Sequence, residues 1–69
     1  MNARQTELLG RLRELVDGYI ADPAVVVRLK ANVEPLKVKY VLAELESNRI
    51  REFSAADQDW IKEIYFNFC

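Results

Sequence analysis

Histidine is absent from this 69-residue chain, and its single cysteine, Cys69, is the last residue. Without histidine, the most common general base, the usual metal ligand and the ordinary serine and cysteine catalytic triads are all missing. A lone cysteine cannot form a disulfide within the chain, so packing has to stabilise the fold. A reducing compartment, the cytoplasm, is therefore the expected location.

Glycine and proline are also scarce, with two residues of each. The sequence contains no glycine-rich phosphate cradle, no Walker motif and no dinucleotide-binding fingerprint. Asp57 and Asp59 resemble the start of a calcium loop, but no glycine or terminal glutamate follows at the required spacing. We therefore expect no enzyme activity, no cofactor, no bound metal and no small-molecule substrate.

Long apolar runs are missing as well. No segment approaches the roughly 20 residues that span a bilayer, and the polar stretch 1–6 does not resemble a secretory signal. Apolar residues nevertheless make up 51% of the chain, so disorder is not expected. The length leaves room for one domain, residues 1–69. We expect a helical domain in the cytoplasm with no membrane association.

Apolar spacing predicts an all-α fold, a small bundle of four helices of which three are long and one is short. From about residue 5 to residue 21, leucines and other apolar residues recur on one arc at about 100° per residue. Asp22 and Pro23 then indicate a new start, with Asp as the N-cap and Pro at the first helical position. Asn32 is expected to end this short second helix in a left-handed conformation.

The third and fourth helices are predicted from similar signals. Glu34 and Pro35 indicate the start of a third helix, which runs to about Ser47. Ser54, followed by Asp57, resembles a capping box at the start of the last helix. Aspartate in the first turn also suits the positive end of the helix dipole.

A β-hairpin over residues 24–42, giving an α+β fold, is the alternative. Three consecutive valines, at 25–27, and partial alternation of apolar and basic residues at 36–42 favour it. Against it, a proline directly follows each of the candidate caps Asp22 and Glu34, and residues 42–46 are strong helix formers. The all-helical prediction is preferred.

The predicted third helix is apolar on two opposed sides. One side carries Val38, Val41, Leu42 and Leu45, and the other carries Leu36, Tyr40 and Ala43. Such a helix is either the central helix, wrapped by its neighbours, or it offers one side to another chain. In the second case Leu36, Tyr40 and Ala43 form a protein interface. Phe66 lies off the apolar arc of the last helix, and we interpret it as an exposed interface aromatic rather than a residue folded back from a fraying end.

Charge is unevenly distributed although the net charge is −1. Residues 28–39 form a candidate basic patch with one acidic residue, Glu34, and residues 40–69 form a candidate acidic patch. The basic patch consists of Arg28, Lys30, Lys37 and Lys39, and the acidic patch of Glu44, Glu46, Glu52, Asp57, Asp59 and Glu63.

These features favour a non-catalytic protein–protein interaction module that self-associates, with the basic middle of one chain against the acidic part of another. A variant of this hypothesis is a small inhibitor or regulator of a larger enzyme or nucleoprotein, in which the acidic patch imitates phosphates. The alternative is a small helix-turn-helix-like nucleic-acid-binding protein that uses the basic segment 28–39. The slightly negative net charge and the mostly apolar reading helix count against nucleic acid.

Overall fold

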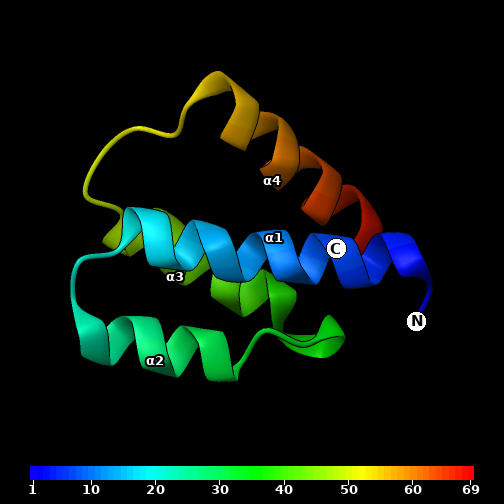
Figure 1. The fold of residues 1–69 in the computed structure, drawn as a ribbon, viewed down its shortest axis with the longest axis horizontal. Helices are drawn as coiled ribbons and strands as arrows, with labels where there is room; N and C mark the ends of the chain where they lie inside the picture. Colours follow the sequence, from blue (N-terminus) through cyan, green and yellow to red (C-terminus); the bar gives the residue numbers. More distant parts are fainter.

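The computed structural model describes residues 1–69 and confirms the all-α class, with four α-helices and no strand (Figure 1). The predicted alternative of a β-hairpin over 24–42 is wrong, because the three valines lie within a helix. The helices are α1 (Ala3–Tyr19), α2 (Pro23–Ala31), α3 (Val38–Asn48) and α4 (Ala55–Phe68), and a short 3-10 helix, η1 (Pro35–Lys37), directly precedes α3.

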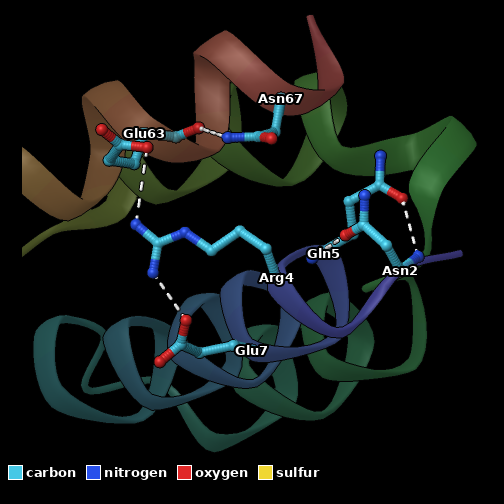
Figure 2. A network of polar contacts seen from close by, with 6 residues as sticks. All are labelled: Asn2, Arg4, Gln5, Glu7, Glu63 and Asn67. Carbon is cyan, nitrogen blue, oxygen red and sulfur yellow. Dashed lines mark hydrogen bonds and ion pairs between the residues drawn. The ribbon is translucent and has the colours of Figure 1, made fainter.

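The first two helices begin with side-chain caps. Asn2 and Gln5 form a reciprocal capping box: the Asn2 Oδ1 accepts from the Gln5 N–H at 2.8 Å, and the Gln5 Oε1 accepts from the Asn2 N–H at 3.3 Å (Figure 2). This box starts α1 at Ala3, two residues earlier than the apolar pattern predicts. At α2 the predicted cap is confirmed, since the Asp22 carboxylate accepts from the Ala24 N–H at 2.9 Å.

The end of the second helix and the start of the third differ in detail from the boundaries that the sequence predicts. Asn32 ends α2 as predicted, but at φ −105° and ψ 8° rather than in the left-handed region. Its side chain instead donates to the Arg28 carbonyl at 2.8 Å, which satisfies an acceptor at the helix end. The third helical segment begins at Glu34 and Pro35 as predicted, but its first turn is a 3-10 helix rather than an α-helix. Glu34 makes no side-chain cap, so residues 35–37 form only η1, and α3 begins at Val38.

The central helix is α1, which packs against each of the other three helices (Figure 1). All four helices contribute to one core of 14 buried side chains, of which Leu8, Leu12 and Val16 on α1 are fully enclosed. The possibility that the third helix occupies this central position is therefore wrong. With extents of 31 × 26 × 16 Å, the molecule is about two helices thick, because packed helix axes lie roughly 8–10 Å apart. Each outer helix consequently keeps an exposed side.

Tyr19, the last residue of α1, holds the beginning of α4 in place. Its hydroxyl donates to the Asp57 Oδ2 at 2.6 Å and accepts from the Ser54 N–H at 3.0 Å. Its ring, 3% exposed, packs on Phe53 with 4.7 Å between ring centroids. Only half of the predicted capping box forms: Ser54 accepts from the Asp57 N–H at 3.1 Å, and the Asp57 carboxylate bonds to Tyr19. The fixed start of α4 sets the separation between α4 and α3.

Candidate functional site

The outer side of α3 exposes apolar residues that no other part of the chain covers. Leu36, in η1, is 94% exposed, Tyr40 is 42% exposed, and Ala43 is also exposed. We call these three residues the α3 ridge. The opposite side of the same helix faces the core and buries Val38, Val41, Leu42 and Leu45. A helix that is apolar on two sides is either wrapped by its neighbours or offers one side to another chain. The exposure of the ridge excludes the first explanation for these residues.

An apolar groove adjoins the ridge, between α3 and α4. Its volume is about 410 Å³, and its lining consists of Leu42, Ala43, Leu45, Glu46, Phe53, Ile61 and Tyr65. Ala43 belongs to both the ridge and the groove, so the two features form one continuous surface. The groove could not be predicted from the sequence because it depends on the distance between two helices. The sequence places Tyr65 within the apolar arc of the last helix, and only the structure shows that it remains 44% exposed.

Phe66 lies apart from this groove. It is 87% exposed at the end of α4, so it does not fold back onto the core. From α4, Ile61 and Tyr65 line the groove, and Phe66 does not. Tyr40 and Ala43 therefore lie exposed on α3, with Leu36 exposed in η1 directly before it, and Phe66 lies at the end of a different helix. Its role at an interface stays a prediction.

The predicted basic patch is mostly engaged in contacts within the chain. The contacts are Arg28 with Glu44 at 3.3 Å, Lys30 with Asp17 at 2.8 Å, and the Lys37 Nζ with the Asn32 Oδ1 at 3.2 Å. Lys39 forms no ion pair and no hydrogen bond within the chain. Two of the four cations are thus paired with carboxylates, whereas Lys37 contacts a neutral amide and Lys39 has no polar side-chain contact.

The predicted acidic patch is spread over α3, the following link and α4, and most of its members also have internal partners. These partners are Arg28 for Glu44, Arg49 for both Glu46 and Glu52, Tyr19 for Asp57, and Arg4 for Glu63. Asp59 has no such contact. A continuous negative surface is therefore not formed by these six residues.

Arg4 links the first helix to the last. Its guanidinium pairs with Glu7 on α1 and, at 3.5 Å, with Glu63 on α4 (Figure 2). The hydrogen bond with Glu7, with the charges of both carboxylates, raises the pKa of Arg4 above its ordinary value. Arg4 and Arg11 also lie over the Trp60 ring, at 5.4 and 4.5 Å from its centroid. The face of Trp60 is thus covered by the chain's own cations, which favours a structural role for this residue.

The chain matches no protein-family model, no curated protein and no solved structure. None of its helices combines the length and the apolarity that a membrane crossing requires. No three histidine, cysteine or acidic side chains are grouped so that they could hold a metal ion. The site is therefore defined by surface shape and polarity alone, and its parts are the α3 ridge, the α3–α4 groove and the unpaired Lys39.

Proposed function

We propose that this protein is a non-catalytic protein–protein interaction module that binds a second copy of itself through the α3 ridge. The observation that carries the proposal is the exposure of Leu36 and Tyr40 on the same helical segment whose Ala43 lines an apolar groove. A scattered apolar side chain on a surface is ordinary, but a contiguous apolar patch usually marks a binding site. The absence of histidine supports a function in binding rather than catalysis.

The energetics require the ridge and the groove to act together. Complete burial of Leu36, which is 94% exposed, contributes about 1.5–3 kcal/mol. Tyr40 is only 42% exposed and contributes less, and a symmetric dimer buries two of each. Association itself costs an estimated 4–15 kcal/mol in lost translational and rotational freedom. Two ridges alone leave little surplus, so we include the groove rim, with Tyr65, in the proposed interface. Tyrosine is enriched at the residues that dominate binding energy.

Two other functions receive less support. A nucleic-acid surface needs several cations free to neutralise phosphates, whereas two of the four members of the basic patch, Arg28 and Lys30, are already paired with carboxylates. A phosphate-imitating inhibitor needs a continuous negative surface, whereas Arg49 alone partly neutralises both Glu46 and Glu52. For both functions the same internal ion pairs would have to open at a cost. Burial of the apolar α3 ridge by itself opens none of these ion pairs.

The compartment forms a part of the proposal too. We place the protein in the cytoplasm because Cys69 is exposed and has no cysteine in the chain to pair with. Exposed unpaired thiols persist where glutathione and thioredoxin keep them reduced.

The test is the solution mass of a ridge variant and of a matched control, both measured by light scattering with reductant present. Tyr40→Glu introduces a charge at the proposed interface and is expected to give monomers of 8.0 kDa. Val27→Glu makes the same kind of change at a residue that is 70% exposed on α2, away from the ridge, and should leave association unchanged. Leu36→Glu, at a residue with almost no contacts in the fold, repeats the test without risk to stability. Equal masses for all variants and the wild type would remove the ridge from the proposal.

A further inference from the structure

Two opposite charges flank the α3 ridge on the side of the groove. Lys39 and Glu46 are seven residues apart, close to two turns at about 3.6 residues per turn, so they lie on the same side of α3. Lys39 is exposed and unpaired. Glu46 has a side chain that is 63% exposed and contacts Arg49 at 3.5 Å, whereas Arg49 contacts Glu52 more closely, at 3.2 Å. Glu46 can therefore turn to a new partner while Arg49 keeps an anion.

The two charges stand almost symmetrically about Ala43. Lys39 lies four residues before it and Glu46 three residues after it. In an antiparallel pair of helices related by a two-fold axis, each residue before the axis faces the residue equally far after it in the other copy. A two-fold axis near Ala43 thus brings Lys39 opposite Glu46 of the second copy to within about 1.5 Å along the helix, one residue rise. The same axis creates this pair twice.

The exposed aliphatic residues follow the same symmetry. Leu36 lies seven residues before Ala43, and Ile50, just after α3, lies seven residues behind it. They are 94% and 63% exposed, although both are large and apolar. Both lie just outside α3, so antiparallel pairing about Ala43 brings Leu36 of one copy and Ile50 of the other to the same end of the interface. Neither side chain has a comparable apolar neighbour to cover it within one chain.

We propose that the partner on the α3 ridge is a second copy of this chain, docked with its α3 antiparallel around a two-fold axis at Ala43, so that Lys39 of each copy pairs with Glu46 of the other. This register rests on the proposed self-association and adds a specific geometry to it. Charge complementarity selects the antiparallel arrangement, because a parallel pair related by a two-fold axis places the charged flanks of the two copies on opposite sides of the interface and forms no Lys39–Glu46 pair.

The small side chain at the axis permits the close approach that this packing needs. Packed helix axes lie roughly 8–10 Å apart, and Cα atoms lie about 2.3 Å from each axis. The two Ala43 Cα atoms at the axis are then about 3.4–5.4 Å apart, a range that overlaps the roughly 4.4–6.8 Å of disulfides. The register can therefore be read by cross-linking.

The first experiment uses the full chain with Cys69→Ser, so that an introduced cysteine is the only thiol. Ala43→Cys is compared with Ser47→Cys, a matched control one turn further along the same exposed side of α3. In the proposed register the two thiols introduced at position 43 meet, whereas the Ser47 positions are about 12 Å apart along the axis. Under mild oxidation Ala43→Cys is expected to form covalent dimers at least about tenfold faster. In urea, where the chains are unfolded, the two rates should be equal.

The second experiment measures the dimer dissociation constant by sedimentation for charge variants in the wild-type chain. Lys39→Glu replaces two attractive pairs by two repulsive ones and is expected to raise the constant about tenfold at low salt. The exchange Lys39→Glu with Glu46→Lys restores both pairs and should return the constant to within about twofold of the wild-type value. Lys62 lies on α4 and, like Lys39 on α3, is exposed and has no ion pair. Lys62→Glu therefore controls for the change in net charge.

The outcomes separate the register from the proposed function. Fast cross-linking at position 43 together with rescue by the charge exchange supports both. A dimer that cross-links equally at 43 and 47, or that the exchange does not rescue, overturns the register and leaves self-association intact. A chain that is monomeric at all concentrations overturns both, even if it binds a different protein.

Discussion

Replacement of Tyr19 by phenylalanine tests the contact that fixes α4 against α1. The substitution keeps the ring in its place against Phe53 and removes only the hydroxyl. Two hydrogen bonds are lost with it, the one to the Asp57 carboxylate at 2.6 Å and the one from the Ser54 N–H at 3.0 Å. Both lie at the start of α4, so their loss weakens the first turn of the helix that forms one wall of the groove.

The size of the effect follows from the chemistry of the two bonds. A hydrogen bond to a charged group contributes about 1.5–3 kcal/mol and a neutral one about 0.5–1.5 kcal/mol. Asp57 is only half-buried and Ser54 is exposed, so water replaces part of each bond after the substitution. We therefore expect Tyr19→Phe to lower the free energy of unfolding by about 1–2 kcal/mol. For a domain of this size, that corresponds to a fall in Tm of roughly 5–15 °C.

The measurement is urea and thermal unfolding, followed by circular dichroism and by the fluorescence of Trp60. Tyr65→Phe is the matched control, because the Tyr65 hydroxyl makes no hydrogen bond within the chain and the residue is 44% exposed. All proteins are compared at one concentration low enough for the chains to be monomeric, since association stabilises the folded state and Tyr65 lies in the proposed interface. If Tyr19→Phe and Tyr65→Phe unfold with the same free energy, the hydroxyl does not anchor α4 and the reasoning is wrong.

Three further predictions concern packing, helix propensity and charge. Leu45→Ala removes a fully buried side chain and should lower the free energy of unfolding in urea by about 2–5 kcal/mol. Leu36→Ala, measured at low protein concentration, should change it by less than about 0.5 kcal/mol. Similar losses for the two variants would contradict the assigned burial. Gly10→Ala adds a methyl group that meets nothing within 4 Å, so the free energy of unfolding should rise by up to about 1 kcal/mol. A lower Tm for this variant would refute the open space at this position. Because Lys39 is the only member of the basic patch without a partner in the chain, binding to duplex DNA should be negligible even at low salt in a fluorescence-anisotropy titration, and steeply salt-dependent binding would revive the nucleic-acid alternative.

Local signals in the sequence predict much of the fold. The apolar arcs identify all four helices, and the caps at Asp22 and Ser54 locate two of their starts. These features depend on residues within one turn of each other, so they can be read without the tertiary structure. The predicted start of α1 is two residues late because the apolar pattern begins after the Asn2 and Gln5 capping box.

Features that depend on tertiary packing could not be predicted in the same way. Glu34 and Pro35 resemble the start of an α-helix, yet the chain forms only a 3-10 turn there. Periodicity shows that α3 is apolar on two sides, but it cannot tell which side faces α1. The groove, likewise, exists only because Tyr19 and the link after α3 fix the position of α4. The candidate ridge is thus predicted from the sequence, while its exposure and its neighbouring groove require the structure.

The charge pattern shows the same division. The sequence separates a basic segment from an acidic one, and this separation suggests complementary patches. In the structure Arg28 meets Glu44 and Lys30 meets Asp17, so much of the pattern is satisfied within one chain. Sequence distance does not predict such pairs, because their members lie on different helices. Lys37 and Lys39 keep charges that no carboxylate of the chain neutralises, and the interface hypothesis uses Lys39.

The most direct test of self-association through the α3 ridge is the mass of the wild-type chain by sedimentation equilibrium. It should be measured over a dilution series with reductant present, so that Cys69 cannot link two chains. The mass is predicted to rise with concentration from 8.0 kDa toward twice that value and to stop there, because a two-fold interface closes at a dimer. A mass that stays at 8.0 kDa up to the highest concentration would contradict the proposal.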